Sequence, residues 1–316
     1  MLYPLIIIAV LYAFLIFLAL RSDGILYQPH PSGYRDSDFP SHTVIKLRSG
    51  SDTITAVYFP YVMPDPPLDA GGDEHSSMRT PHSPPKKKQH DGRWDNDYVP
   101  PTGFTLLMSH GNAEDIGDNR DLYREYAARG FAVFAYDYHG YGTSTGTPSE
   151  RNANLDERAA WDYLVNTLHI PPSRIILHGT SVGCGPAVEL AAQLSSLPVD
   201  QRPAALILQS PFRSAFTVLT RVPLLPWDKF NNARRIREVR MPVLVIHGTA
   251  DQVIPFSHGQ AVFHNASPIG DSDAPLTRDS GKQHLWLRNA GHNDIFILSS
   301  ATYFQKIESF TSQLPH

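Results

Sequence analysis

Cysteine and excess positive charge are both scarce in this chain, and each shortage excludes a class of protein. The 316 residues include a single cysteine, Cys184, so no intrachain disulfide framework is possible and a reducing compartment is compatible with the composition. Lys and Arg number 27 against 31 Asp and Glu, which leaves a formal net charge of −4. This balance gives no basic surface for nucleic acid, so we expect no nucleic-acid partner.

Sequence patterns of cofactor binding are missing as well. No group of His, Cys, Asp and Glu has the spacing of a metal site, and no glycine-rich segment has the pattern of a phosphate-binding loop. Internal repeats are also absent. We therefore expect no metal and no cofactor, in a chain long enough for one large α/β domain with a sizeable core.

An uncharged apolar run, Leu2 to Leu20, opens the sequence. As a helix it would be about 28 Å long, near the roughly 30 Å hydrocarbon thickness of a bilayer. A cleaved signal peptide is the alternative, but no basic residue precedes the run and no small-residue cleavage site follows it. We predict a transmembrane anchor at residues 1–22 and a linker at 23–42. Arg21 and Arg35 then favour a single-pass protein of the endoplasmic reticulum or plasma membrane whose large domain lies in the cytosol.

Short apolar strands alternate with amphipathic helices through residues 43–316, which is the third predicted unit. Alternation of this kind is typical of an α/β fold with a mostly parallel central sheet covered by helices on both faces. Two polar, low-complexity inserts interrupt the pattern at about 63–101 and 269–282. The predicted strands are Thr43 to Leu47, Thr53 to Phe59, Phe104 to Met108, Phe131 to Tyr136, Ile175 to His178, Ala205 to Leu208, Val243 to His247 and His284 to Leu287, and the predicted helices are Arg120 to Arg129, Leu155 to Leu168 and Gly185 to Ala192.

The segment Gly179-Thr180-Ser181-Val182-Gly183 lies between one of these strands and a helix of small residues. A serine on a sharp strand-to-helix turn needs glycine neighbours, because the backbone is strained and closely packed there. The similar segment Gly142 to Gly146 does not directly follow a strand, so Ser144 is expected in an irregular loop. The sequence therefore predicts the nucleophile elbow of an α/β-hydrolase fold, with Ser181 as the nucleophile.

The base and the acid that activate such a serine follow it in the order Asp, then His. Asp251 and His292 each come shortly after a predicted parallel strand, so both should lie at the carboxyl edge of the sheet. His247 and His284 lie within or at the start of strands, and there they suit core or lower-edge positions. We predict a Ser181, Asp251 and His292 triad.

A tetrahedral intermediate also needs two backbone N–H donors. Val182 follows the nucleophile and would supply one of them. We predict that Asn112 supplies the second, because Gly111 lets the loop after the Phe104 to Met108 strand turn back toward Ser181. A plain turn at His110-Gly111 is the alternative interpretation.

Six stretches of the sequence carry a family resemblance: His110 to Asp115, Asp137 to Gly142, Pro148 to Glu150, Val245 to Thr249, Phe256 to Gly259 and Gly291 to Asp294. With them the sequence resembles the membrane-associated α/β-hydrolase-domain proteins, and above all the acyl-protein thioesterases that remove palmitate from cysteines. The resemblance implies the same triad. The anchored monoacylglycerol and lysophospholipid lipases share two further stretches, Gly146 to Arg151 and Ser210 to Phe212. The depalmitoylases attach through acylated N-terminal cysteines, whereas this chain has an apolar run there.

An apolar segment after Pro211 is expected either to form a lid over an acyl chain or to be ordinary core. Phe212 and Trp227 are the substrate-binding residues we predict in it. The whole pattern favours a membrane-anchored serine hydrolase that cleaves long-chain acyl thioesters or esters. Its partners would then be the bilayer and an S-acylated protein or acyl-lipid substrate, while the oligomeric state is not predicted. A monoacylglycerol or lysophospholipid lipase, a serine peptidase and a non-catalytic membrane scaffold are the alternatives.

Overall fold

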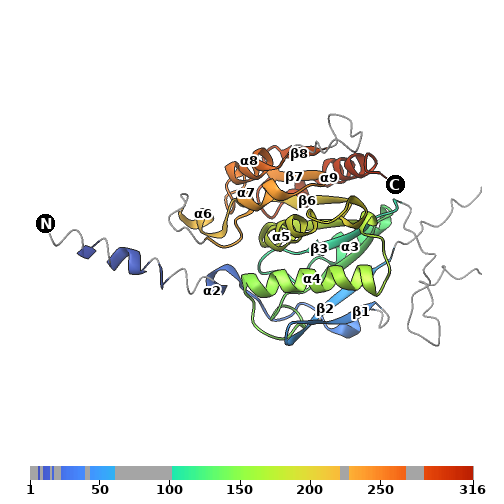
Figure 1. Ribbon diagram of the computed structural model, residues 1–316, viewed down its shortest axis with the longest axis horizontal. Coiled ribbons are helices and arrows are strands. Elements are labelled where there is room, and N and C mark those ends of the chain that lie inside the picture. Colours follow the sequence, from blue (N-terminus) through green and yellow to red (C-terminus); the bar gives the residue numbers. More distant parts are fainter. Residues whose placement is uncertain are drawn as a thin grey trace, which may run out of the picture.

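A single mixed sheet of eight strands forms the centre of the computed structural model (Figure 1), which describes residues 6–7, 10–14, 16–17, 23–39, 43–60, 102–220, 228–267 and 281–315. The strand order is β1-β2-β4-β3-β5-β6-β7-β8. The β1–β2 hairpin pairs antiparallel with β4, and all the other strands are parallel. The strands are β1 (Val44–Ser49), β2 (Asp52–Phe59), β3 (Thr105–Ser109), β4 (Ala132–Tyr136), β5 (Ile175–Thr180), β6 (Ala205–Gln209), β7 (Val243–Gly248) and β8 (Lys282–Leu287).

Helices cover both faces of the sheet, as the alternating pattern predicts (Figure 1). One face packs against α4, α5 and α8, and the other against α3 and α9. Strands β3, β4, β6 and β7 are buried along their whole length, and β5 is buried up to Gly179, which explains their apolar runs. The helices are α2 (Asp23–Leu26), α3 (Arg120–Ala128), α4 (Glu150–Asn166), α5 (Cys184–Leu194), α6 (Ala215–Thr220), α7 (Asn232–Arg235), α8 (Phe256–Asn265) and α9 (Ile295–Thr311), with 3₁₀ turns at Asp36–Asp38, Pro172–Arg174, Ser181–Gly183, Val199–Gln201 and Ile236–Glu238.

The predicted strands and the three predicted helices are confirmed, with shifts at their ends. Helix α4 begins at Glu150 rather than Leu155, because the Ser149 side chain accepts the Asn152 N–H and caps the helix there. Strand β8 begins at Lys282, so the second predicted insert ends before that residue. Residues 269–280 of that insert, and the whole of the first insert, lie outside the described residues.

The predicted anchor and linker fall at the amino-terminal end of the chain. Among the described residues, no helix combines the length and apolar character needed to cross a membrane. Residues 23–39 pack on the α/β domain, with Tyr27, Tyr34 and Phe39 buried. The Tyr34 hydroxyl donates a 2.5 Å hydrogen bond to buried Asp137, more than 100 residues along the chain. This part of the predicted linker therefore contributes to the domain core.

Candidate active site

Ser181 lies at a strained turn between β5 and α5. Its φ of +52° is in the left-handed region that non-glycine residues rarely adopt. The flanking glycines are required by space: a Cβ on Gly179 would lie 2.5 Å from the Gly183 carbonyl oxygen, and one on Gly183 would lie 2.2 Å from that of Ser109. The turn therefore has the geometry expected of a nucleophile elbow, and it lies in backbone contact with the end of β3.

Three loops at the carboxyl edge of the sheet bring the predicted triad together. His292 Nε2 lies 3.0 Å from Ser181 Oγ, and His292 Nδ1 lies 2.7 Å from Asp251 Oδ2. The three residues follow β5, β7 and β8, which are separated in sequence but parallel in the same sheet. A hydroxyl, an imidazole and a carboxylate in this order can activate a serine for attack on a carbonyl carbon.

Asp251 is held as a carboxylate by its surroundings. Burial acts to raise its pKa, but hydrogen bonds from His247 and His292, together with the Ile254 N–H, hold the pKa well below its usual range. Its Oδ1 accepts the N–H groups of Val253 and Ile254 at 2.9 and 2.7 Å. An ionised Asp251 can fix the tautomer of His292 and stabilise its imidazolium form.

His247 is a neighbour of Asp251 that the sequence interpretation assigned to the core or lower edge. It is fully buried, and its Nε2 lies 3.0 Å from the Ile254 carbonyl oxygen and 3.4 Å from Asp251 Oδ2. Its ring is closely enclosed, since a Cβ on Gly259 would lie 2.4 Å from His247 Nδ1. Its position near the end of β7, four residues before Asp251, was the sequence feature that could have predicted this contact.

The segment from the last residue of β3 into the following loop, residues 109–113 (the β3 loop), carries the second predicted oxyanion donor. Asn112 lies in this loop, and its side-chain Oδ1 accepts the Gln28 N–H at 2.9 Å and the Tyr141 O–H at 2.8 Å. Ala113, the next residue, has a φ of +55°. Val182, the other predicted donor, lies in the 3₁₀ turn with Ser181. The close approach of Gly183 to Ser109 places this turn beside the β3 loop.

Buried polar side chains of Tyr138 and Asp137 contact His110 and stabilise the β3 loop. Tyr138 donates its hydroxyl to the His110 carbonyl oxygen at 2.7 Å. The His110 Nε2 atom lies 3.3 Å from Asp137 Oδ1, with both side chains fully buried. Burial lowers the pKa of His110, but the carboxylate of Asp137 outweighs it and raises the pKa overall. Asp137 also accepts the Ile116 N–H, so it joins both ends of the turn that follows β3.

The two predicted substrate-binding residues fall in the segment between β6 and α7; we call its described residues, 210–220 and 228–231, the cap. Phe212 is buried, with its ring centroid 6.4 Å from that of Phe230. Phe230 in turn packs over Gly185, where a Cβ would meet its ring at 2.4 Å. Trp227 lies outside the described residues. Phe212 thus contributes to packing between the cap and α5.

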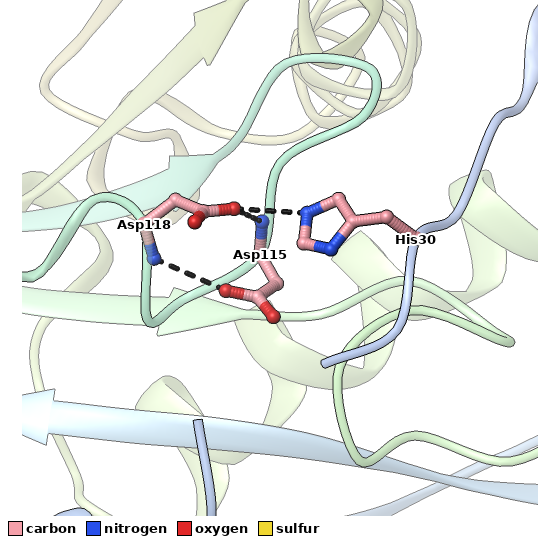
Figure 2. Close-up of side chains that lie close together, drawn as sticks. All are labelled: His30, Asp115 and Asp118. Atoms are coloured by element: carbon pink, nitrogen blue, oxygen red, sulfur yellow. Dashed lines mark hydrogen bonds and ion pairs between the residues drawn. The ribbon is translucent and has the colours of Figure 1, made fainter. Parts of the chain in front are cut away.

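One cluster in the described part of the chain has side chains close enough to share a metal ion (Figure 2). His30, Asp115 and Asp118 place one ligand atom each within 4.8 Å of one another. His30 Nε2 lies 3.0 Å from Asp118 Oδ2, and each carboxylate accepts the backbone N–H of the other aspartate at 3.0–3.1 Å. The Gly33 N–H also binds Asp115, at 2.7 Å. These hydrogen bonds explain why the three side chains lie together: they attach residues 30–33 to the turn before α3.

Comparison with solved structures shows the same fold in proteins of very different sequence. An esterase from Pyrococcus furiosus superimposes with a TM-score of 0.61 at 12% identity, over 91% of this chain and 96% of that one. A puromycin-hydrolysing peptidase from Mycobacterium tuberculosis gives a TM-score of 0.58 at 17% identity, over 85% of this chain and 38% of that one.

Sequence relatives are closer. The family described as Serine aminopeptidase, S33 matches residues 101–225. Alpha/beta hydrolase domain-containing protein 17B of Homo sapiens is 38% identical over 218 residues, which are 68% of each chain. Protein 17C of Mus musculus is 39% identical over 223 residues, 69% of this chain and 63% of that one. With this likeness and its eight-stranded fold, the chain is a hydrolase that belongs to the α/β-hydrolase-domain family of the 17B and 17C proteins.

Proposed function

We propose that this protein is a membrane-anchored serine hydrolase that removes long-chain acyl groups from S-acylated proteins. The observation that carries the proposal is the continuous hydrogen-bonded series from Ser181 through His292 to Asp251. The resemblance to acyl-protein thioesterases and the 38–39% identity to the 17B and 17C proteins support a thioester as the bond cleaved.

Acylation begins when Ser181 Oγ attacks the thioester carbonyl carbon and its proton passes to His292 Nε2. The Oγ–C bond forms, the carbonyl π electrons move to oxygen, and the N–H groups of Val182 and Asn112 receive that oxyanion. The intermediate then collapses, the C–S bond breaks, and His292 returns the proton to the leaving cysteine sulfur. Asp251, held ionised, stabilises the imidazolium while both steps proceed.

Deacylation repeats the sequence with water as the nucleophile. His292 takes a proton from water, the resulting hydroxide attacks the acyl carbon, and the ester bond to Ser181 breaks. The proton returns to Ser181 Oγ and the fatty acid leaves. No atom other than those of the substrate, water and the triad changes bonding.

The position of the amino-terminal segment supports action at a membrane surface. Asp23 lies 2.6 Å from Lys229 of the cap, so the chain enters the described domain beside the cap. In Figure 1, α2 and α6 lie on the same side of the molecule, at the carboxyl end of the sheet. An anchor at residues 1–22 would thus hold this edge toward the bilayer, where acyl groups are found.

A side-by-side rate measurement on the full chain in lipid vesicles tests the proposal. The substrates are a palmitoyl-thioester peptide, a monoacylglycerol and the matching palmitoyl-amide peptide, each with wild type and Ser181→Ala. We expect the thioester to be cleaved fastest and the variant to lose at least about 10⁴-fold in rate.

Each other outcome identifies a competing function. Faster cleavage of the glyceride would make the protein a lipid esterase, and cleavage of the amide at a comparable rate would favour the peptidase suggested by the matched S33 family. Rates that are unchanged in Ser181→Ala would show that Ser181 is not the nucleophile. That result would contradict a serine hydrolase and favour a non-catalytic membrane scaffold.

A further inference from the structure

Residues 23–28, which we call the N-terminal clamp, reach the β3 loop through a main-chain contact. The Gln28 N–H donates to Asn112 Oδ1 at 2.9 Å and lies 3.0 Å from the Tyr141 hydroxyl oxygen. The same Asn112 oxygen accepts the Tyr141 O–H at 2.8 Å. Two donors from segments 84 and 29 residues away in sequence therefore converge on one side-chain atom.

Fixing that atom also restricts the backbone of Asn112. A side chain held by two donors limits rotation about its own Cα, and hence the direction of the main-chain N–H proposed to receive the oxyanion. Ala113 next to it has positive φ, so the backbone here needs support from its neighbours. Tyr27 supplies packing, with its ring edge-to-face against Tyr138 and Tyr141 at 6.5 and 6.4 Å.

The other end of the clamp contacts Lys229, near the carboxyl-terminal end of the cap. Asp23 Oδ1 lies 2.6 Å from Lys229 Nζ and accepts the Glu150 N–H at the start of α4 at 3.3 Å. Glu150 Oε1 accepts the N–H of Phe230 at 2.6 Å, and Phe230 has a φ of +46° and packs over Gly185 of α5. Asp23 thus joins the chain entry to the cap and to the start of α4, while Phe230 connects the cap to α5.

We propose that the N-terminal clamp is a positioning element of the active site: Gln28 orients the amide of Asn112, and Asp23 holds the cap. The inference rests on the proposed function for the role of the Asn112 amide. Because the clamp begins directly after the predicted anchor, the segment that would attach the chain to the membrane also contacts the β3 loop.

The loop contact is tested by the rate at which a fluorophosphonate labels Ser181 in the full chain. In that reaction the Oγ–P bond forms, fluoride leaves, His292 takes the proton and the phosphonyl oxygen occupies the oxyanion site. Gln28→Pro removes the main-chain N–H, and the matched control Gln28→Ala keeps it. We expect about a tenfold slower labelling for Gln28→Pro and a rate within twofold of wild type for the control.

Tyr141→Phe is a second variant that keeps the backbone unchanged. We expect it to lower kcat for a short-chain ester about fivefold to tenfold with little change in KM, because an oxyanion contact acts only in the transition state. In the background of Asn112→Ala, which lacks the shared acceptor, Tyr141→Phe should have no further effect. A merely structural role would instead give additive losses and similar changes in both constants.

The cap contact is tested by Asp23→Ala and Lys229→Ala, assayed with esters of four and sixteen acyl carbons. Each variant should raise KM for the long ester twofold to fivefold more than for the short one, and the double variant should resemble the single ones. Equal changes for both esters would overturn this half of the proposal.

Failure of the positioning role and failure of the proposed function give different results. Wild-type labelling rates in both Gln28→Pro and Tyr141→Phe would overturn the positioning role, whichever substrate is preferred. Normal Ser181 labelling with no cleavage of the palmitoyl thioester would overturn the proposed substrate, while slower labelling of the Gln28→Pro variant would still support the clamp.

Discussion

Glu157 is a buried acid beneath the β3 loop, and replacing it with glutamine should stabilise the protein at neutral pH. Its side chain in α4 is fully buried, and its Oε2 accepts the hydroxyl groups of Ser109 at 3.0 Å and Tyr136 at 3.3 Å. Burial raises its pKa to about 8, even though these two hydrogen bonds act to lower it. The folded protein therefore holds Glu157 in its neutral form at pH 7.

The sign of the effect follows from the two protonation equilibria. Below pH 4.5, the ordinary pKa, both folded and unfolded chains carry the proton; between pH 4.5 and 8 the unfolded chain releases it first. The stability present below pH 4.5 is therefore lost as the pH rises toward 8. At about 1.4 kcal/mol per pH unit, Glu157 lowers the free energy of unfolding by about 3 kcal/mol at pH 7 and by less than about 1 kcal/mol at pH 5.

Urea titrations of wild type and Glu157→Gln at pH 5, 6 and 7 measure this difference. The glutamine oxygen can still accept from Ser109 and Tyr136, so the variant should gain about 2 to 3 kcal/mol more at pH 7 than at pH 5. Glu125→Gln, at an exposed position of α3, is the control and should show no such trend. A difference between Glu157→Gln and wild type that stays constant from pH 5 to 7 would refute the reasoning.

Two further predictions concern the elbow and a second buried group. Gly183→Ala should lower the free energy of unfolding by more than about 2 kcal/mol, because its Cβ would lie 2.2 Å from the Ser109 carbonyl oxygen. The control Gly24→Ala, whose Cβ would have nothing within 4 Å, should change this free energy by less than about 1 kcal/mol. Equal effects of the two substitutions in thermal unfolding would contradict the packing argument. Burial lowers the pKa of His178 to about 4. On acidification from pH 6.5 to 4.5 the unfolded chain is protonated at His178 before the folded chain is. The free energy of unfolding of wild type should therefore fall by about 2 kcal/mol more than that of His178→Gln, measured in urea. An equal fall in the two proteins would contradict this prediction.

The sequence was enough to predict the fold class and the grouping of Ser181, Asp251 and His292. Strands buried on both faces appear as continuous apolar runs, and parallel strands bring their carboxyl ends to one edge, so residues that follow them meet. The roles predicted for the Val182 and Asn112 amides follow from the same argument and stay predictions. Local pattern and chain order were sufficient here because the geometry depends on the sheet itself.

Contacts between distant segments could not be predicted in the same way. The residues around Tyr27 and Tyr34 look like a linker, because the partners that hold them on the domain lie between 82 and 113 residues away and no periodic pattern marks them. His247 was assigned to the core or lower edge from its strand; it is buried, but it also lies beside Asp251. The start of α4 was misplaced because a cap at Ser149, rather than an apolar residue, fixes it.

The contact between Gly183 and the Ser109 carbonyl oxygen has a consequence for which substitutions can alter the specificity of this enzyme. The distance between the turn that carries the nucleophile and the β3 loop is set by main-chain atoms, with no side chain between them. Under the proposed function, substitutions in the cap would alter which acyl group fits without altering that distance. On that proposal, acyl-chain preference would be changed through the cap while the main-chain spacing between the nucleophile turn and the β3 loop is kept.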